Sequence, residues 1–184
     1  MKRKIYSKLV EWKMQRADKE ALLIDGARRV GKSYIVEEFA KNEYRSYIFI
    51  NFAQLTNEMR EVFEQYITNV ESLLMRLQIF SGTKLYPHES LIIFDEVQRY
   101  PKAREAIKWL VADTPYHYIE TGSLVSIRTN SRGITIPSEE CHIDMYPMDF
   151  EEFLWALDQT MLADYIHDSF AQQQPLGAAL HRKA

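Results

Sequence analysis

The stretch LLIDGARRVGKS, residues 22–33, places a short apolar run directly before a turn that contains two glycines and ends in lysine and serine. The apolar run predicts a buried strand at residues 21–24, and the apolar side chains of residues 35–40 have helical spacing. A strand, a glycine-containing turn and a helix N-terminus in this order form a cradle of backbone N–H groups that suits phosphate. This feature restricts the chain to folds that hold such a loop between a strand and a helix.

Residues 26–33 read G-x-x-x-x-G-K-[ST], which is the pattern of a P-loop. Gly26 and Gly31 permit backbone angles that a side chain would penalise. We expect Lys32 to reach the β- and γ-phosphates of a nucleotide and the Ser33 hydroxyl to ligate Mg²⁺. A plain glycine-rich turn is the alternative. The residues expected to contact the nucleotide are Gly26, Ala27, Arg28, Arg29, Val30, Gly31, Lys32, Ser33 and Tyr34. No side-chain chemistry is assigned to the two arginines.

A second buried strand ends in carboxylates at LIIFDE, residues 91–96. Asp95 is expected to hold Mg²⁺ through water, and Glu96 to orient and polarise the attacking water. This is the Walker B pattern, although four apolar residues followed by Asp-Glu can also be a strand that enters a solvated turn. The acid next to Asp95 favours water over a small molecule as the phosphate acceptor.

Further polar residues follow a third buried segment, YIETGS, residues 118–123. Thr121 or Ser123 is a candidate sensor of the phosphate, and an ordinary turn is the alternative. Arg128 and Arg132 are candidates for an arginine finger that acts on the same or a neighbouring subunit. Loop arginines in water are the competing interpretation. The expected catalytic set is Glu96, Lys32, Thr121 and Arg132.

Strands and helices are expected to alternate along the chain. The apolar pattern predicts strands at residues 21–24, 47–52, 91–94, 116–119 and 141–146, the last at a half-exposed edge. Helices are predicted between the strands, at residues 3–16 before them and at 160–172 after them. Another helix begins after Asp149, its N-cap, with Glu152 at the capping-box position. The order predicts an α/β fold with three α-β-α layers and a mostly parallel five-stranded sheet.

Composition restricts the partners and the compartment. A chain of 184 residues suits one hydrophobic core, and a net charge of −3 creates no global basic field, although the lysines and the arginine near the N-terminus form a local one. No apolar run approaches the roughly 20 residues that cross a bilayer. Cys141 is the single cysteine of the sequence, so we expect a reducing cytoplasm. The sequence contains no Asn-Lys-x-Asp segment to read guanine, which leaves ATP as the expected nucleotide.

The motifs GARRVGKS, LIIFDEVQ and TGS, followed by IPSEECHIDMYPMDFEEFLWA, occur in this order. Over residues 3–158 the chain resembles the AAA-like ATPases of bacteria and archaea that typically precede a restriction-endonuclease-like C-terminal domain. The resemblance implies an additional-strand P-loop fold with strand order 5-1-4-3-2, binding of ATP and Mg²⁺, and ATP hydrolysis. It also implies an ATPase domain at residues 1–158. Residues 159–184 are then a C-terminal helix and tail that begin a missing region.

The leading hypothesis is a Mg²⁺-dependent ATPase that acts as a conformational switch on an attached domain or a protein partner. One alternative is a nucleotide-binding interaction module with little turnover, and another is a P-loop kinase for a small molecule. Phosphate release without an acceptor indicates the first, tight binding without turnover the second, and acceptor-dependent ADP formation the third. A DNA partner has no support in this segment, and self-association is left open.

Overall fold

The computed structural model describes residues 2–123 and 138–177 of the chain. The described elements are α1 (Ile5–Gln15), β1 (Ala21–Gly26), α2 (Lys32–Glu43), β2 (Ser46–Asn51), α3 (Asn57–Tyr66), α4 (Val70–Ser81), β3 (Ser90–Asp95), the 3₁₀ helix η1 (Val97–Arg99), α5 (Pro101–Asp113), β4 (His117–Thr121), β5 (Glu140–Met145), α7 (Phe150–Ala156) and α8 (Thr160–Ala171). Every predicted strand and helix is present, with ends shifted by a few residues. None of the described helices is long and apolar enough to cross a membrane.

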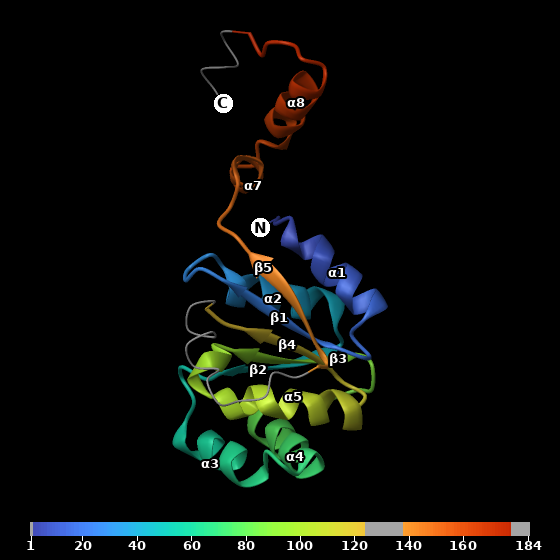
Figure 1. Ribbon diagram of the computed structural model, residues 1–184, viewed down its shortest axis with the longest axis vertical. Helices are drawn as coiled ribbons and strands as arrows, with labels where there is room; N and C mark the ends of the chain where they lie inside the picture. The colour runs from blue at the N-terminus through green and yellow to red at the C-terminus, as the bar shows by residue number, and fades with distance from the viewer. Residues whose placement is uncertain (1, 124–137, 178–184) are drawn as a thin grey trace. The chain divides into compact units, whose positions relative to one another are not determined.

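The five strands form one parallel sheet in the order β2-β3-β4-β1-β5 (Figure 1). This is the predicted order 5-1-4-3-2 seen from the other edge, so the expected topology is confirmed. Strand β4 lies between β1 and β3, which end in the two segments predicted to bind the nucleotide. Because all strands are parallel, their carboxyl ends meet at one edge of the sheet.

The three central strands differ from the edge strand β5 in burial. Every residue of β3 and β4 is buried, as is β1 up to its last residue, because helices cover both faces of a parallel sheet. Strand β5 pairs with β1 from Ala21↔Glu140 to Gly26↔Met145 and keeps several residues partly exposed. The prediction of a half-exposed edge strand at this position is confirmed.

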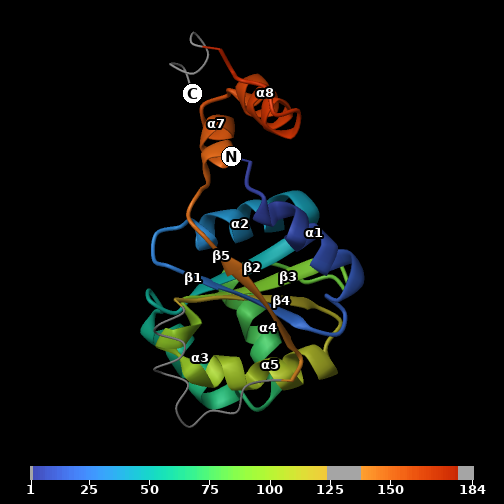
Figure 2. The ribbon, with the colours of Figure 1, turned by 45° about the horizontal axis from the view of Figure 1, so that its top comes forward.

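One face of the sheet is covered by α1 and α2, and the opposite face by α3, α4 and α5 (Figures 1 and 2). On the first face, Leu9 and Trp12 of α1 and Phe39 of α2 belong to one buried cluster with Leu22 and Ile24 of β1. Burying side chains of this size contributes about 1.5–3 kcal/mol each. The predicted three-layer arrangement is therefore confirmed.

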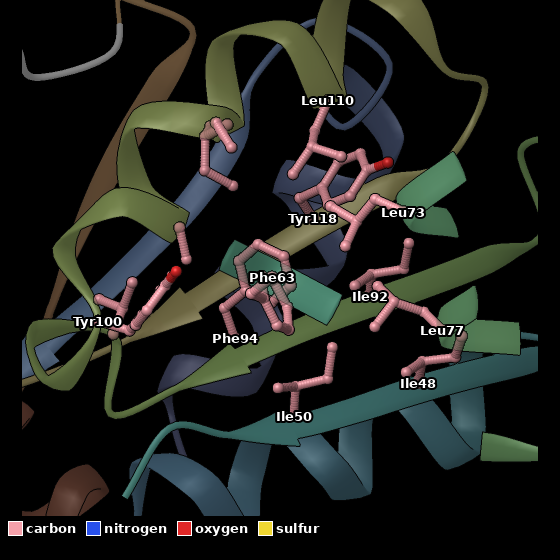
Figure 3. Close-up of a cluster of buried hydrophobic side chains, with 14 of the residues drawn as sticks. Ile48, Ile50, Phe63, Leu73, Leu77, Ile92, Phe94, Tyr100, Leu110 and Tyr118 are labelled. Atoms are coloured by element: carbon pink, nitrogen blue, oxygen red, sulfur yellow. The ribbon is translucent and has the colours of Figure 1, made fainter. Parts of the chain in front are cut away.

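The second hydrophobic cluster lies under α3, α4 and α5. Figure 3 shows Ile48 and Ile50 of β2 and Ile92 of β3 together with Leu77 of α4 in this cluster. Aromatic rings close its end near the carboxyl edge of the sheet. Phe52 stacks on Tyr100 with ring centroids 5.5 Å apart and an interplanar angle of 10°. This packing holds the connection after β2 against the segment that follows β3.

The described residues divide into two compact units, one of which is Ile5–Tyr146 and the other residues 2–4 with 147–177. In the second unit, Asp149 accepts a hydrogen bond from the Glu152 backbone at 2.9 Å, and the Glu152 side chain accepts one from Asp149 at 3.2 Å. The predicted capping box is thus present. Arg3 pairs with Glu152 at 3.2 Å, and both side chains are buried. The domain boundary at residue 158 stays a prediction.

Candidate functional site

The loop between β1 and α2 requires glycine at both ends. Gly26 has a φ of 149°, and a Cβ added there would lie 2.1 Å from the Met145 carbonyl oxygen of β5. Gly31 caps the N-terminus of α2 with a φ of 96°. Side chains rarely adopt these angles, so the backbone role predicted for both glycines is confirmed. Within the loop, residues 27–29 are exposed to solvent.

Lys32 lies across this loop. Its Nζ donates hydrogen bonds to the carbonyl oxygens of Gly26 at 3.0 Å and Ala27 at 2.7 Å, and the residue is only 7% exposed. Burial lowers the pKa of the Lys32 ammonium, while the nearby carboxylates of Glu96, Asp25 and Asp95 act to raise it. The ammonium therefore lies among the carbonyl oxygens of the loop.

Asp95 is the centre of a small network of polar side chains. The Ser33 hydroxyl donates to Asp95 Oδ1 at 2.7 Å, and the Thr121 hydroxyl donates to the same oxygen. Asn51 Nδ2 donates to Asp95 Oδ2 at 2.8 Å. The structure thus brings together Ser33 and Asp95, the two predicted metal ligands, from α2 and β3. A hydroxyl beside a carboxylate fits the preference of Mg²⁺ for oxygen ligands.

Asn51 was missed by the sequence analysis. It is the last residue of β2 and stands in register with Asp95, the last residue of β3. A polar residue that ends an apolar strand beside the Asp95 strand was the available signal, because parallel strands end at the same edge. The amide fixes the orientation of the carboxylate that faces Ser33.

The chain changes direction sharply at Glu96, directly after β3. The Glu96 backbone is left-handed, with a φ of 57°, which costs a non-glycine residue about 1–2 kcal/mol and occurs often at functional sites. The Gln98 amide donates to Glu96 Oε2 at 2.5 Å. The Glu96 backbone N–H points to the Thr121 hydroxyl at 3.4 Å. The carboxylate is thereby held by Gln98 and lies close enough to Lys32 to raise the pKa of the ammonium.

The remaining predicted residues differ in their surroundings. Thr121 is buried and its hydroxyl faces Asp95, and Ser123 is buried two residues later. Tyr34 is half exposed on α2, and its hydroxyl is hydrogen-bonded to the Glu38 side chain, which raises the pKa of the phenol. Arg128 and Arg132 lie outside the described residues.

A family model described as an AAA domain matches residues 18–154. The chain belongs to this AAA domain family. No curated protein matches the chain. The matched segment includes the whole sheet and the loop of Gly26–Ser33, and the AAA-like P-loop fold agrees with the strand order.

The AAA domain contains a further polar cluster next to this loop that the sequence analysis did not find. Asp25 is 2% exposed, and its Oδ2 lies 3.0 Å from His142 Nε2. Burial and the neighbouring Asp144 raise the pKa of the Asp25 carboxyl, while His142 acts in the opposite direction. Asp25 is one residue before Gly26 in a strand otherwise read as apolar, so its polarity was the only signal.

Proposed function

We propose that this AAA domain binds ATP with Mg²⁺ and hydrolyses it to ADP and phosphate. The observation that carries the proposal is the contact between Ser33 Oγ and Asp95 Oδ1 at 2.7 Å, beside a glycine-flanked loop that Lys32 spans. A hydroxyl that follows the loop and a buried carboxylate at the end of β3 are the two protein groups that a metal-bound triphosphate needs. Family membership supports a nucleotide-binding role.

Each residue has a separate part in the proposed reaction. Backbone N–H groups of the loop and the Lys32 ammonium bind the phosphates, and Ser33 and Asp95 hold the metal. The metal held there would supply positive charge that offsets the negative charge developing during phosphoryl transfer. Glu96 accepts a hydrogen bond from the attacking water and orients it toward the γ-phosphorus. Thr121 and Asn51 orient the Asp95 carboxylate.

The proposed switch uses the segment that follows Glu96. Gln98 belongs to η1, which leads directly into α5 at Pro101, and the Gln98 amide contacts the Glu96 carboxylate. When ATP is converted to ADP, the groups that contact the Glu96 carboxylate would change. The hydrogen bond between Glu96 and Gln98 would then shift, and with it η1 and the start of α5. We propose that an attached domain or a protein partner reads this movement.

Lys32→Ala tests the phosphate contacts. Loss of a buried ammonium that binds phosphate oxygens is expected to weaken ATP binding about tenfold to hundredfold, measured by isothermal titration calorimetry. Lys41→Ala is the matched control, because Lys41 lies on the same helix with its ammonium on exposed Glu37 at 2.7 Å. Equal ATP affinity in the two variants would contradict the role of Lys32.

Glu96→Gln tests the chemistry separately from binding. The amide keeps the shape of the side chain and cannot accept a proton, so phosphate release is expected to fall about hundredfold or more while Mg²⁺-ATP still binds. Glu61→Gln, at an exposed position of α3, is the control. A Glu96→Gln variant that hydrolyses ATP at the parental rate would remove Glu96 as the group that activates water.

The alternatives are separated by one further assay. Phosphate release without any acceptor supports the ATPase, whereas ADP formation that requires an added small-molecule acceptor would indicate a kinase. Tight ATP binding without turnover would indicate an interaction module. Running the assay at several protein concentrations tests the proposed finger Arg132, because a finger supplied by a neighbouring subunit makes the rate per chain rise with concentration. Running it with and without DNA tests whether a polynucleotide stimulates hydrolysis.

A further inference from the structure

A cluster of two histidines and an aspartate lies at the end of the sheet opposite the Gly26–Ser33 loop. Asp18 follows α1 in the connection to β1, His88 precedes β3, and His117 is the first residue of β4. The amino ends of the parallel strands meet there, whereas Asp95 and Thr121 stand at their carboxyl ends. This cluster is therefore separate from the proposed nucleotide site.

The three side chains converge on one point. Asp18 Oδ1 lies 2.8 Å from His88 Nδ1 and 2.9 Å from His117 Nε2, and one ligand atom of each residue lies within 4.8 Å of the others. Tetrahedral zinc, with bonds of about 2.0–2.1 Å, separates its ligand atoms by about 3.3 Å. Opening the cluster from hydrogen-bond spacing to this spacing needs a movement of about half an ångström, which the exposed Asp18 side chain permits.

His117 is held in the orientation that a metal ligand requires. It is 4% exposed, and its Nδ1 lies 2.8 Å from the buried Tyr44 hydroxyl. In the metal-free chain His117 Nε2–H donates to the Asp18 carboxylate, and Nδ1 accepts from the Tyr44 hydroxyl. Metal binding would move the proton to Nδ1, which then donates to the Tyr44 hydroxyl oxygen and leaves the Nε2 lone pair to bind the ion. Histidine ligands of metals commonly donate their second N–H to a neighbouring acceptor in this way, which fixes the ring and the tautomer. The Trp12 ring meets the imidazole edge-on at 6.2 Å between centroids.

His88 is held by an unusual backbone. Its φ is 59°, a left-handed conformation that costs a side chain of this kind about 1–2 kcal/mol, and its N–H donates to the Pro115 carbonyl at 2.6 Å. This hydrogen bond ties the connection before β3 to the residue two positions before β4. The imidazole is thereby directed at Asp18 and at His117, whose ring centroid is 6.5 Å away.

We propose that Asp18, His88 and His117 form a zinc site whose fourth position is open to water or an exogenous ligand. Two imidazoles and one carboxylate are typical ligands of Zn²⁺, and three protein ligands with an open position are a recurrent arrangement. Asp18 and His88 are exposed, with side-chain exposures of 64% and 63%, so the metal can enter from solvent. Bound zinc ties the connection after α1 to the amino ends of β3 and β4 and stabilises the folded AAA domain.

The test uses the full chain, freed of metal with a chelator and exchanged into metal-free buffer. Titration with Zn²⁺ by calorimetry, and with Co²⁺ by visible absorption, is expected to show one ion per chain with tetrahedral Co²⁺ bands and a higher Tm. Asp18→Asn and His88→Ala are expected to weaken Zn²⁺ binding at least tenfold. Both sites are exposed, so these variants should keep the parental circular dichroism spectrum.

Two controls locate the ion. His167→Ala, at an exposed position of α8, is expected to bind Zn²⁺ like the parent. His142→Ala removes the histidine of the other cluster, Asp25–His142–Asp144, and is also expected to leave binding unchanged. The proposal is overturned if no Zn²⁺ binds, if Asp18→Asn and His88→Ala bind with parental affinity, or if His142→Ala alone abolishes binding. Tyr44→Phe is expected to weaken binding about tenfold, through loss of the acceptor for His117.

Discussion

Asp95 shows how a single carboxylate depends on side chains from several elements. Its two oxygens accept hydrogen bonds from Ser33 of α2, Thr121 of β4 and Asn51 of β2. The residue is 1% exposed, so solvent does not compete for these oxygens. A buried carboxylate with several donors has one fixed orientation, and that orientation determines where a metal can be bound.

Thr121→Val tests this dependence. Valine keeps the shape of threonine and removes the donor to Asp95 Oδ1. A hydrogen bond to a charged group contributes about 1.5–3 kcal/mol, so the Mg²⁺ concentration that gives half-maximal phosphate release is expected to rise about tenfold. The measurement is a Mg²⁺ titration of ATP hydrolysis.

The conservative replacement Thr121→Ser separates the hydroxyl from packing. Serine retains the donor and is expected to keep the parental dependence on Mg²⁺. If Thr121→Val and Thr121→Ser raise the required Mg²⁺ concentration alike, loss of the hydroxyl does not account for the effect, because serine retains it. If Thr121→Val needs the same Mg²⁺ concentration as the parent, the orientation of the Asp95 carboxylate does not depend on this contact.

At the scale of elements, the pairing of β1 with β5 depends on a position without a side chain. Gly26 ends β1 opposite Met145 of β5, and the Met145 carbonyl oxygen occupies the space that a Cβ would need. The same residue begins the phosphate loop. The close approach of two strands and the start of the loop are therefore coupled at one residue.

Gly26→Ala is expected to lower the free energy of unfolding by at least about 2 kcal/mol, because both the backbone angle and the contact with Met145 are unfavourable. Gly82→Ala is the matched control. Gly82 also has a positive φ, 64°, but an added Cβ would meet nothing within 4 Å, so a loss of only about 1 kcal/mol is expected. Urea unfolding of both variants gives the comparison, and equal losses would show that the strand contact is not limiting.

At the scale of the whole molecule, a buried charged cluster joins elements that are distant in the sequence. Arg104 of α5 binds Glu140 of β5 through two hydrogen bonds of 2.7 and 3.1 Å. Glu120 of β4 is fully buried nearby. Burial and the neighbouring Glu140 raise the pKa of Glu120 well above its ordinary value, while Arg104 acts to lower it. Glu120 is therefore neutral in the folded chain at pH values where it is ionised in the unfolded chain.

This difference gives stability a pH dependence of known sign. A carboxyl with a raised folded pKa disfavours folding increasingly as the pH rises above its unfolded pKa, toward the folded value. Glu120→Gln removes this penalty and is expected to increase the free energy of unfolding by about 2 kcal/mol at pH 7 and by little at pH 4. Urea unfolding at both pH values measures the difference. A loss of stability at pH 7, or a gain that does not depend on pH, would contradict the assignment.

Much of the fold could be predicted from local patterns. Buried runs such as residues 91–94 and helical spacings such as residues 35–40 report on neighbours along the chain, and these short-range patterns locate strands and helices. The capping residues Asp149 and Glu152 act within one helical turn and were recognised for the same reason. The strand order came from the resemblance of the whole chain to AAA-like ATPases, because local patterns do not specify which strands pair.

The sequence by itself determined the strand, loop and helix around Gly26–Ser33 and the carboxylates at residues 95 and 96, since these signals are contiguous. Only the tertiary structure decided that Asn51 and Thr121 bind Asp95, that Arg104 meets Glu140, and that Asp18 draws His88 and His117 together. Each of these contacts joins residues far apart in the chain. The distance in space between such residues depends on strand order, register and the packing of helices on the sheet. No short stretch of sequence contains this information.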